Sequence, residues 1–117
     1  MKYERLRKDA DFKNVYKKGK SAANKTFVIY FAKNGLSCTR IGFSISKKVG
    51  NAVKRNRIRR LIKENLKDMD NLKQGYDIIF IARIASSDID FYDTGRAIRY
   101  LCKKSGVLQS EKNYKQV

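Results

Sequence analysis

The chain has 117 residues, which is the length of one domain with a single ordinary core. Hydrophobic residues make up 42% of it, which excludes a disordered polar segment. The net charge of +17, from 28 Lys and Arg against 11 Asp and Glu, favours a polyanionic partner, with nucleic acid as the first candidate and an anionic membrane surface as the second. We expect one domain over residues 1–117, ending in a loosely ordered tail over 107–117.

The cysteine and histidine content argues against a disulfide-rich or metal-binding protein. Cys38 and Cys102 are isolated, without a CxxC pair, and the chain has no histidine, so both cysteines are expected to be core or surface thiols and no metal site is expected. The first residues, MKYERLRKDADF, contain no apolar signal-peptide stretch, and no run in the chain reaches transmembrane length. The sequence therefore predicts a cytoplasmic protein without a membrane partner.

The first predicted elements in chain order are a short helix and an apolar strand. The segment DADFKNVYKKG, residues 9–19, predicts the helix, with Asp9 as its N-cap and Gly19 as its C-terminal stop. The segment TFVIYFA, residues 26–32, is rich in aromatic and β-branched residues and is apolar on both faces, which is typical of a buried strand. The segment NGLSC that follows predicts a turn, with room for a further short strand near residues 36–39.

The next predicted strand, RIGFSIS at residues 40–46, has two different faces. Ile41, Phe43 and Ile45 alternate along it and predict a face that packs in the core. The opposite face carries small residues: Gly42, Ser44 and Ser46. A strand with such a face leaves space above it, where another group is expected to lie.

The segment SKKVGNAVKRNRIRRLIKE, residues 46–64, concentrates the positive charge. Asn51 is expected to cap a helix that begins near Ala52. Eight bases and no acid occur between residues 47 and 63, so like charges repel at helical spacing and an anionic partner is needed to offset them. The core side of this helix is expected to carry Ile58, Leu61, Ile62 and Met69, with Leu66 at its edge. The opposite side is expected to carry Asn56, Arg60, Lys63 and Lys67, with Arg57 on its flank.

The last third of the chain predicts a buried strand, YDIIFIAR at 76–83, and a final helix. Ser87 with Asp90 resembles a capping box, and Gly106 lies past the helix end. The final helix is expected to carry Tyr92, Ile98, Leu101 and Cys102. The element order is αββ(β)αβα, which predicts an α/β (α+β) sandwich with a mixed sheet of about four strands and helices packed on it.

Three readings of the basic helix compete. A solvated surface helix usually alternates its charges, and this one does not. A membrane-surface helix needs a wide apolar face with bulky residues, whereas the apolar residues here are needed for the core. Structured RNA fits better, because guanidinium groups pair with phosphates and stack on bases, and Asn51 and Asn56 add groups for base edges or 2′-hydroxyls. Composition alone does not separate RNA from DNA.

The segment FSISKKVGNAVKRNRIRRLIKE resembles the bacterial ribonuclease P protein component, whose signature is an Arg-Asn-Arg core on this helix, here residues 55–57. The segments DFKNVYKKGKSAANKTFVIYF and YDIIFIAR are similar to the family's first helix and strand and to its late strand, so the resemblance covers residues 5–105. It implies a split β-α-β unit with a left-handed crossover, against the usual right-handed rule.

The resemblance also implies a function. Members of this family are protein subunits of a ribonucleoprotein endonuclease that removes the 5′ leader of precursor tRNA, with catalysis by the RNA subunit and its magnesium ions. The protein itself is expected to bind no cofactor and to take no small-molecule substrate. It is not expected to be catalytic, since it has no histidine and no carboxylate cluster suited to hydrolysis. The alternative is a basic ribosomal or RNA-chaperone protein without a role in cleavage.

Two groups of site residues follow from this resemblance. The residues expected to bind the catalytic RNA are Lys47, Lys48, Asn51, Lys54, Arg55, Asn56, Arg57, Arg59, Arg60 and Lys63. The residues expected to bind the leader of precursor tRNA are Phe12, Tyr16, Val28, Tyr30, Ser44 and Ser46. Exposed aromatic rings give stacking platforms for single-stranded bases, which suits this second set. An aromatic pair at i,i+4, such as Phe12 and Tyr16, is also common in a core, and the residues alone favour that reading for Phe12.

Overall fold

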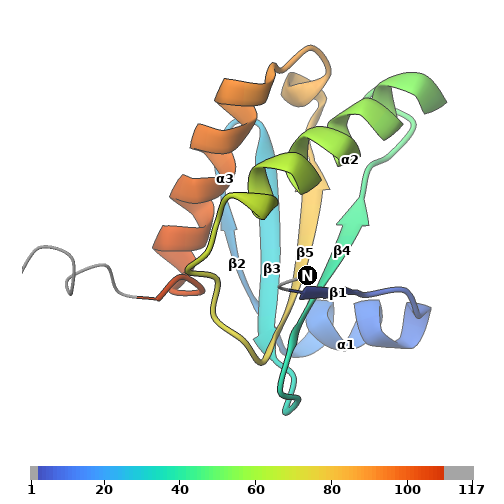
Figure 1. The fold of residues 1–117 in the computed structure, drawn as a ribbon. Helices are drawn as coiled ribbons and strands as arrows, with labels where there is room; N and C mark the ends of the chain where they lie inside the picture. Colours follow the sequence, from blue (N-terminus) through green and yellow to red (C-terminus); the bar gives the residue numbers. More distant parts are fainter. Residues whose placement is uncertain (1–2, 110–117) are drawn as a thin grey trace, which may run out of the picture.

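A five-stranded mixed sheet forms the centre of the protein, which a computed structural model describes over residues 3–109 (Figure 1). The sheet order is β1-β4-β5-β3-β2, with β4 parallel to β1 and β5 and the remaining pairs antiparallel. The strands are β1 (Tyr3–Arg5), β2 (Lys20–Ala23), β3 (Phe27–Lys33), β4 (Thr39–Ser44) and β5 (Tyr76–Ala82). The helices are α1 (Asp9–Lys18), α2 (Ala52–Lys67) and α3 (Phe91–Ser105), with a short 3-10 helix η1 (Ile84–Ser86). The predicted mixed α/β fold is confirmed.

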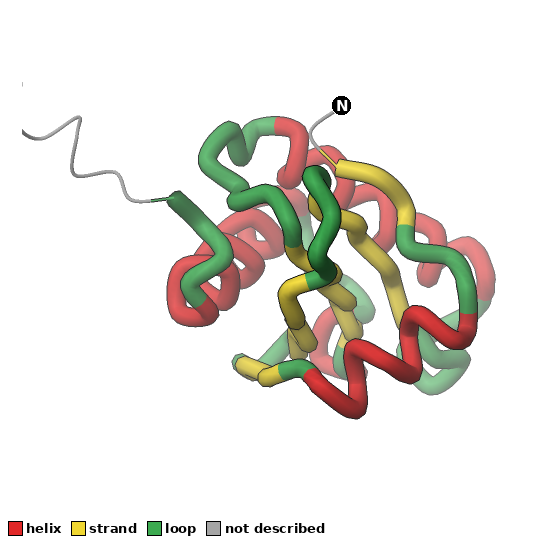
Figure 2. The backbone as a smooth tube through the Cα atoms, turned by 90° about the horizontal axis from the view of Figure 1, so that it is seen from below, coloured by secondary structure: helices red, strands yellow, loops and turns green. Residues whose placement is uncertain are grey.

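The sheet separates two apolar layers of unequal size. On one face, α2 and α3 pack on β3, β4 and β5 in the main core, where Phe27, Ile29 and Phe80 are fully buried. On the other face, α1 packs on a smaller cluster of Leu6 and Ile79. Figure 2 looks along the sheet and shows strands lying between these helices. Because β3 and β5 are covered on both faces, their sequences are mostly apolar, except for Lys33 at the end of β3 and Asp77 in β5, which pairs with Arg40.

The connection from β4 through α2 to β5 is a left-handed crossover. In Figure 1, α2 lies in front of the sheet, β4 and β5 both point upward, and β5 lies to the left of β4. A right-handed crossover seen from this side would place β5 to the right. The unusual connection brings α2 across the front of the sheet directly after β4.

The ends of α1 and α2 follow local chemistry. Asn51 caps α2 as predicted, since its side-chain oxygen accepts a hydrogen bond from the Lys54 amide at 3.0 Å. Gly19 ends α1 as predicted, with a backbone that is extended. The prediction that Asp9 caps α1 is wrong, because Lys8 holds the N-cap position and Asp9 is the first helical residue. There its carboxylate still lies near the positive end of the helix dipole.

The end positions of α3 correct two further expectations. Asp90 itself caps α3 by accepting from the Asp93 amide at 2.7 Å, so Ser87 is not part of a capping box. Tyr92 is 71% exposed and does not join the core side of this helix. Gly106 follows the helix with a φ of 79°, the left-handed conformation in which glycine carries no Cβ penalty.

The structure has one strand more than expected, and its two edge strands were not predicted. β1 and β2 have three and four residues. Residues 36–38 form bends rather than a separate strand, and Thr39 opens β4. At the C-terminal end, Val107 is fully buried and Leu108 pairs with Leu72, so the expected tail over 107–117 begins with ordered residues. Residues 110–117 lie outside the described part of the chain.

Candidate RNA interface

The basic helix α2 is held firmly by its apolar side. Ile58 and Ile62 are fully buried, and Leu66 and Met69 are nearly so, as the helical spacing predicted. Burying a side chain of this size contributes roughly 1.5–3 kcal/mol. The charged side of α2 is therefore carried on a rigid support, and its cations need no further folding to meet a partner.

The cations of α2 differ in how much they are engaged within the protein. Arg60 is exposed, and its side chain makes no hydrogen bond or ion pair with another residue that the structure describes. Arg57 is half-buried and donates to the Ile89 carbonyl at 2.7 Å, so it is tied to the loop before α3. Lys54 forms an exposed ion pair with Asp88 at 3.3 Å, which contributes little to stability. Arg55 is half-buried, beside the apolar side of the helix.

The segment before α2 adds further cations. Lys47 and Lys48 are exposed in the turn between β4 and α2. Ser46, in the same turn, accepts a hydrogen bond from the Lys48 amide at 3.3 Å and is exposed. This turn joins the front of the sheet, where α2 lies, to the end of β4.

A second group of cations gathers around the ring of Phe43. The ammonium group of Lys63 lies 5.7 Å from the ring centre, and the guanidinium group of Arg5 lies 5.9 Å from it. The pKa of Lys63 is lowered by burial and by repulsion from Arg5, Arg59 and Arg7. Arg5 and Arg7 were not among the predicted site residues, and their only signal in the sequence is the basic run at the start of the chain.

Arg59 belongs to the same group. One of its terminal nitrogens donates to the Asn56 side chain at 2.7 Å, which leaves these two polar side chains paired with each other. Its Nε is buried without a hydrogen-bond partner among the described residues. An unpaired guanidinium nitrogen beside other cations is costly, and an anion at this point would relieve that cost.

On the opposite face of the sheet, the predicted aromatic residues form one cluster. The rings of Phe12 and Tyr16 lie 6.5 Å apart on α1, and Tyr16 meets Tyr30 of β3 edge-on at 5.0 Å. Tyr16 is 39% exposed, whereas Phe12 and Tyr30 are half-buried against the smaller apolar cluster. These rings therefore serve both as packing for α1 and as a surface beside it.

The small face of β4 is only partly open. Over Gly42 the space is filled, because a Cβ at this position would lie 2.5 Å from the tip of the Phe12 ring. The next row across the sheet is formed by Val28, Ile81 and Ser44, which pair in register on the same face and are all half-buried. The structure thus corrects the expectation of an empty face: Phe12 fills the space over Gly42, and Val28, Ile81 and Ser44 are half-buried.

A cavity of about 440 Å³ connects the two regions at the β1–β4 edge of the sheet. Its lining residues are Arg5, Leu6, Arg7, Asp9, Phe12, Phe43 and Ser44. It brings together the rim of the aromatic cluster and the cations around Phe43. Over residues 3–109, no group of three His, Cys, Asp or Glu side chains is arranged to hold a metal ion, and no helix is long and apolar enough to cross a membrane.

A small α+β domain with a rigid basic helix on one side of its sheet and partly exposed aromatic rings on the other belongs to the class of nucleic-acid-binding proteins. Residues 1–106 match a family model described as Ribonuclease P. The ribonuclease P protein component of Clostridioides difficile (strain 630) is 52% identical over 104 residues, covering 87% of this chain and 91% of that protein. The chain belongs to this family of ribonuclease P protein components.

Solved structures agree with this assignment. The RNase P protein from Staphylococcus aureus is 40% identical with a TM-score of 0.85, covering 92% of this chain and 100% of that one. The protein from Thermotoga maritima is 34% identical with a TM-score of 0.79, covering 86% and 96%. The chain therefore acts in tRNA 5′ maturation as the protein component of a ribonucleoprotein.

Proposed function

We propose that this protein binds the catalytic RNA of ribonuclease P through α2 and the single-stranded 5′ leader of precursor tRNA through the α1 face of the sheet. Catalysis belongs to the RNA subunit, with magnesium ions held by the RNA. The protein supplies binding and charge compensation in the bacterial cytoplasm.

The observation that carries this proposal is the presence of two chemically different surfaces on one rigid domain. The α2 surface offers guanidinium and ammonium groups in numbers suited to the phosphates of a folded RNA. The α1 face offers aromatic rings beside the half-buried row of Val28 and Ser44, which suits unpaired bases. A basic protein with only a general chaperone role would not need the second surface.

The contribution of the protein to the reaction is then one of binding. Cations along α2 offset repulsion between phosphates that the folded catalytic RNA brings together, so less magnesium is needed to reach its active form. Contacts to the leader are made with precursor tRNA and lost with mature tRNA, so they raise affinity for the substrate over the product. The chain contains no histidine, and its described carboxylates form no metal cluster, so no group for hydrolysis is assigned to it.

The proposed contacts with the catalytic RNA comprise the ten residues named above. Arg60, Lys47 and Lys48 are the most available of them, since they are exposed and are not engaged with other described residues through their side chains. Lys54 and Arg57 would exchange an internal partner for a phosphate. Their contribution to affinity is expected to be smaller for that reason.

The decisive experiment is reconstitution with a bacterial ribonuclease P RNA at a magnesium concentration too low for the RNA alone. Added protein should restore cleavage of precursor tRNA and should raise affinity for precursor over mature tRNA. An equally basic ribosomal protein serves as the control and should do neither. Cleavage by RNA-free protein that survives nuclease treatment would overturn the non-catalytic role, and failure to restore cleavage would favour the ribosomal or chaperone alternative.

A further inference from the structure

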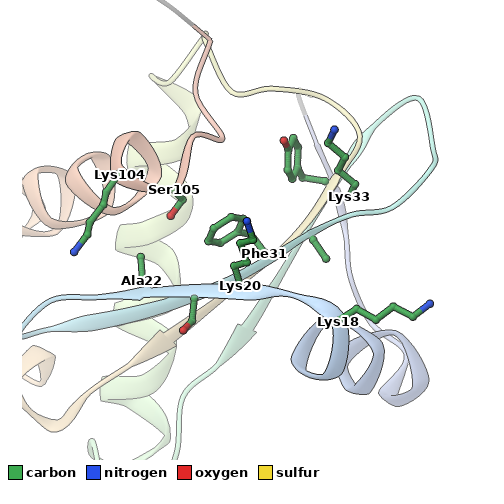
Figure 3. Close-up of a pocket in the computed structure, with 10 residues that line it drawn as sticks. Lys18, Lys20, Ala22, Phe31, Lys33, Lys104 and Ser105 are labelled. Carbon is green, nitrogen blue, oxygen red and sulfur yellow. The ribbon is translucent and has the colours of Figure 1, made fainter.

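A cavity of about 640 Å³ lies away from both surfaces of the proposed interface. It opens between the β2–β3 edge of the sheet and the C-terminal end of α3 (Figure 3). Its lining residues are Lys18, Lys20, Ser21, Ala22, Phe31, Ala32, Lys33, Tyr76, Lys104 and Ser105. Nothing in the proposed function uses it.

Strand register places the walls of this cavity on the α3 face of the sheet. Lys20 pairs with Phe31, and Tyr76 pairs with Lys33, so these four side chains point to the same side. Phe31 packs against the main core and not against the cluster under α1. The cavity is therefore on the face opposite the Phe12–Tyr16–Tyr30 cluster, and leader bound there would not fill it.

The charge around the cavity is positive without exception. Four lysines line it and no carboxylate does. None of the four forms an ion pair with a residue that the structure describes, and Lys104 has only the Tyr100 ring beside its ammonium group, at 5.9 Å. Ammonium groups gathered without acids repel one another, and an anion between them would remove that repulsion.

The floor of the cavity is apolar and partly aromatic. Phe31 and Tyr76 are half-buried and pack against the core, and Ala22 lies beside them. Figure 3 shows Phe31 at the centre, with Lys20 beside it, Lys33 on one side and Lys104 with Ser105 on the α3 side. The volume is within the range of ligand sites, and an aromatic floor with a ring of cations suits a flat base joined to phosphates.

We propose that this cavity is a second single-stranded RNA site, which holds a nucleotide base against Phe31 and Tyr76 and its phosphates between Lys20, Lys33 and Lys104. The choice of RNA rests on the proposed function, since RNA is the polyanion that this protein is proposed to bind. The lysines lie on both sides of the aromatic floor, so a strand can enter on one side and leave on the other.

The test uses the protein alone, titrated with a short single-stranded oligouridylate and followed by NMR. The methyl signal of Ala22, which lines the cavity, should shift on binding. Because Ala22 reports on this cavity, binding at the leader surface does not disturb the reading. Affinity read from Ala22 should fall with salt, as expected when phosphates are neutralised.

A pair of double variants with equal charge separates this site from general attraction. Lys20→Ala with Lys104→Ala removes two lining lysines, whereas Lys17→Ala with Lys103→Ala removes two exposed lysines of neighbouring positions that do not line the cavity. The first pair should lower the slope of log affinity against log salt by about 1.4, for two phosphates of a single strand, and the second should leave it nearly unchanged. An equal decrease of this slope in both double variants, or an Ala22 chemical shift that does not change on titration, would overturn the proposal. Reconstituted cleavage tests the proposed function separately.

Discussion

Individual cations of α2 differ in what an RNA phosphate would gain by meeting them. Lys63 lies against Phe43 among other cations, and its pKa is lowered by burial and by Arg5, Arg59 and Arg7. A phosphate at this position would remove repulsion that the free protein carries. Arg60 lies exposed in water, so a phosphate there gains one charge pair and releases counterions, with little change in the protein itself.

Arg60→Ala is the cleanest test of the α2 surface, because its side chain makes no contact that holds the fold together. The slope of log affinity for the catalytic RNA against log salt should decrease by about 0.9, with stability unchanged. Salt-dependent binding assays measure this, and Arg99→Ala, an exposed arginine on α3 without an ion pair to a described residue, is the matched control. Identical slopes for both variants would place the RNA contact elsewhere. Arg57→Ala is a poorer test, since it also removes the hydrogen bond to Ile89.

Tyr30→Ala tests the leader surface. If a base stacks on this ring, affinity for precursor tRNA should fall by about 1–3 kcal/mol while affinity for mature tRNA stays constant. Both affinities are measured on the assembled holoenzyme, with thermal denaturation as the check on folding. Tyr92→Ala, an exposed tyrosine on α3, should change neither. A loss of thermal stability alone, or equal losses of affinity for precursor and mature tRNA, would assign Tyr30 to the core and not to the leader surface.

Among the elements, α1 makes one notably close contact with β4. The tip of the Phe12 ring occupies the space that a side chain at position 42 would need. Gly42 therefore allows the Phe12 ring of α1 to approach the sheet closely.

Gly42→Ala should push the Phe12 ring away and cost about 1–3 kcal/mol of unfolding free energy, as overpacking does. Urea denaturation measures the change. The same substitution made in a Phe12→Leu background should cost much less, because the clashing ring atoms are gone. An equal cost in both backgrounds would show that some contact other than Phe12 determines the need for glycine.

The sequence was informative for elements with strong local signals. Asn51 and the spacing of Ile58 and Ile62 predict α2, and alternating or continuous apolar runs predict β3, β4 and β5. β1 and β2 are too short for a period and exist because they pair with β4 and β3. For the site, the sequence indicated which residue types could bind RNA. It did not indicate the contact of Phe12 over Gly42, because that contact joins positions 30 residues apart and depends on packing.

The molecule as a whole carries its charge unevenly. Residues 40–67 hold ten basic side chains and one acidic, whereas residues 68–117 hold eight basic and seven acidic. The balanced range, residues 68–117, includes β5 and α3. The basic range, residues 40–67, includes α2 and nearly all of β4. Repulsion in the free protein is therefore concentrated on the surface that the RNA is proposed to cover.

Unfolding free energy should rise with sodium chloride between about 0.01 and 0.15 M, as the Debye length shortens from about 30 to about 8 Å. Screening relieves repulsion in the folded state more than in the expanded chain. Chemical denaturation at each salt concentration measures the slope. A variant with Lys13→Gln and Lys17→Gln, both exposed on α1, should show a shallower rise. A flat or falling dependence in the wild type would mean that local ion pairs outweigh the net charge.

The two short edge strands also affect how copies of the protein meet one another. β1 has three residues, with Glu4 and Arg5 exposed, and β2 has four, with Lys20 exposed. Edges that are short and charged offer few unpaired backbone groups to a strand of another molecule, which protects the sheet against edge-to-edge aggregation. β1 and β2, the strands that were not predicted from the sequence, thus help to prevent sheet-to-sheet association between copies of the free protein.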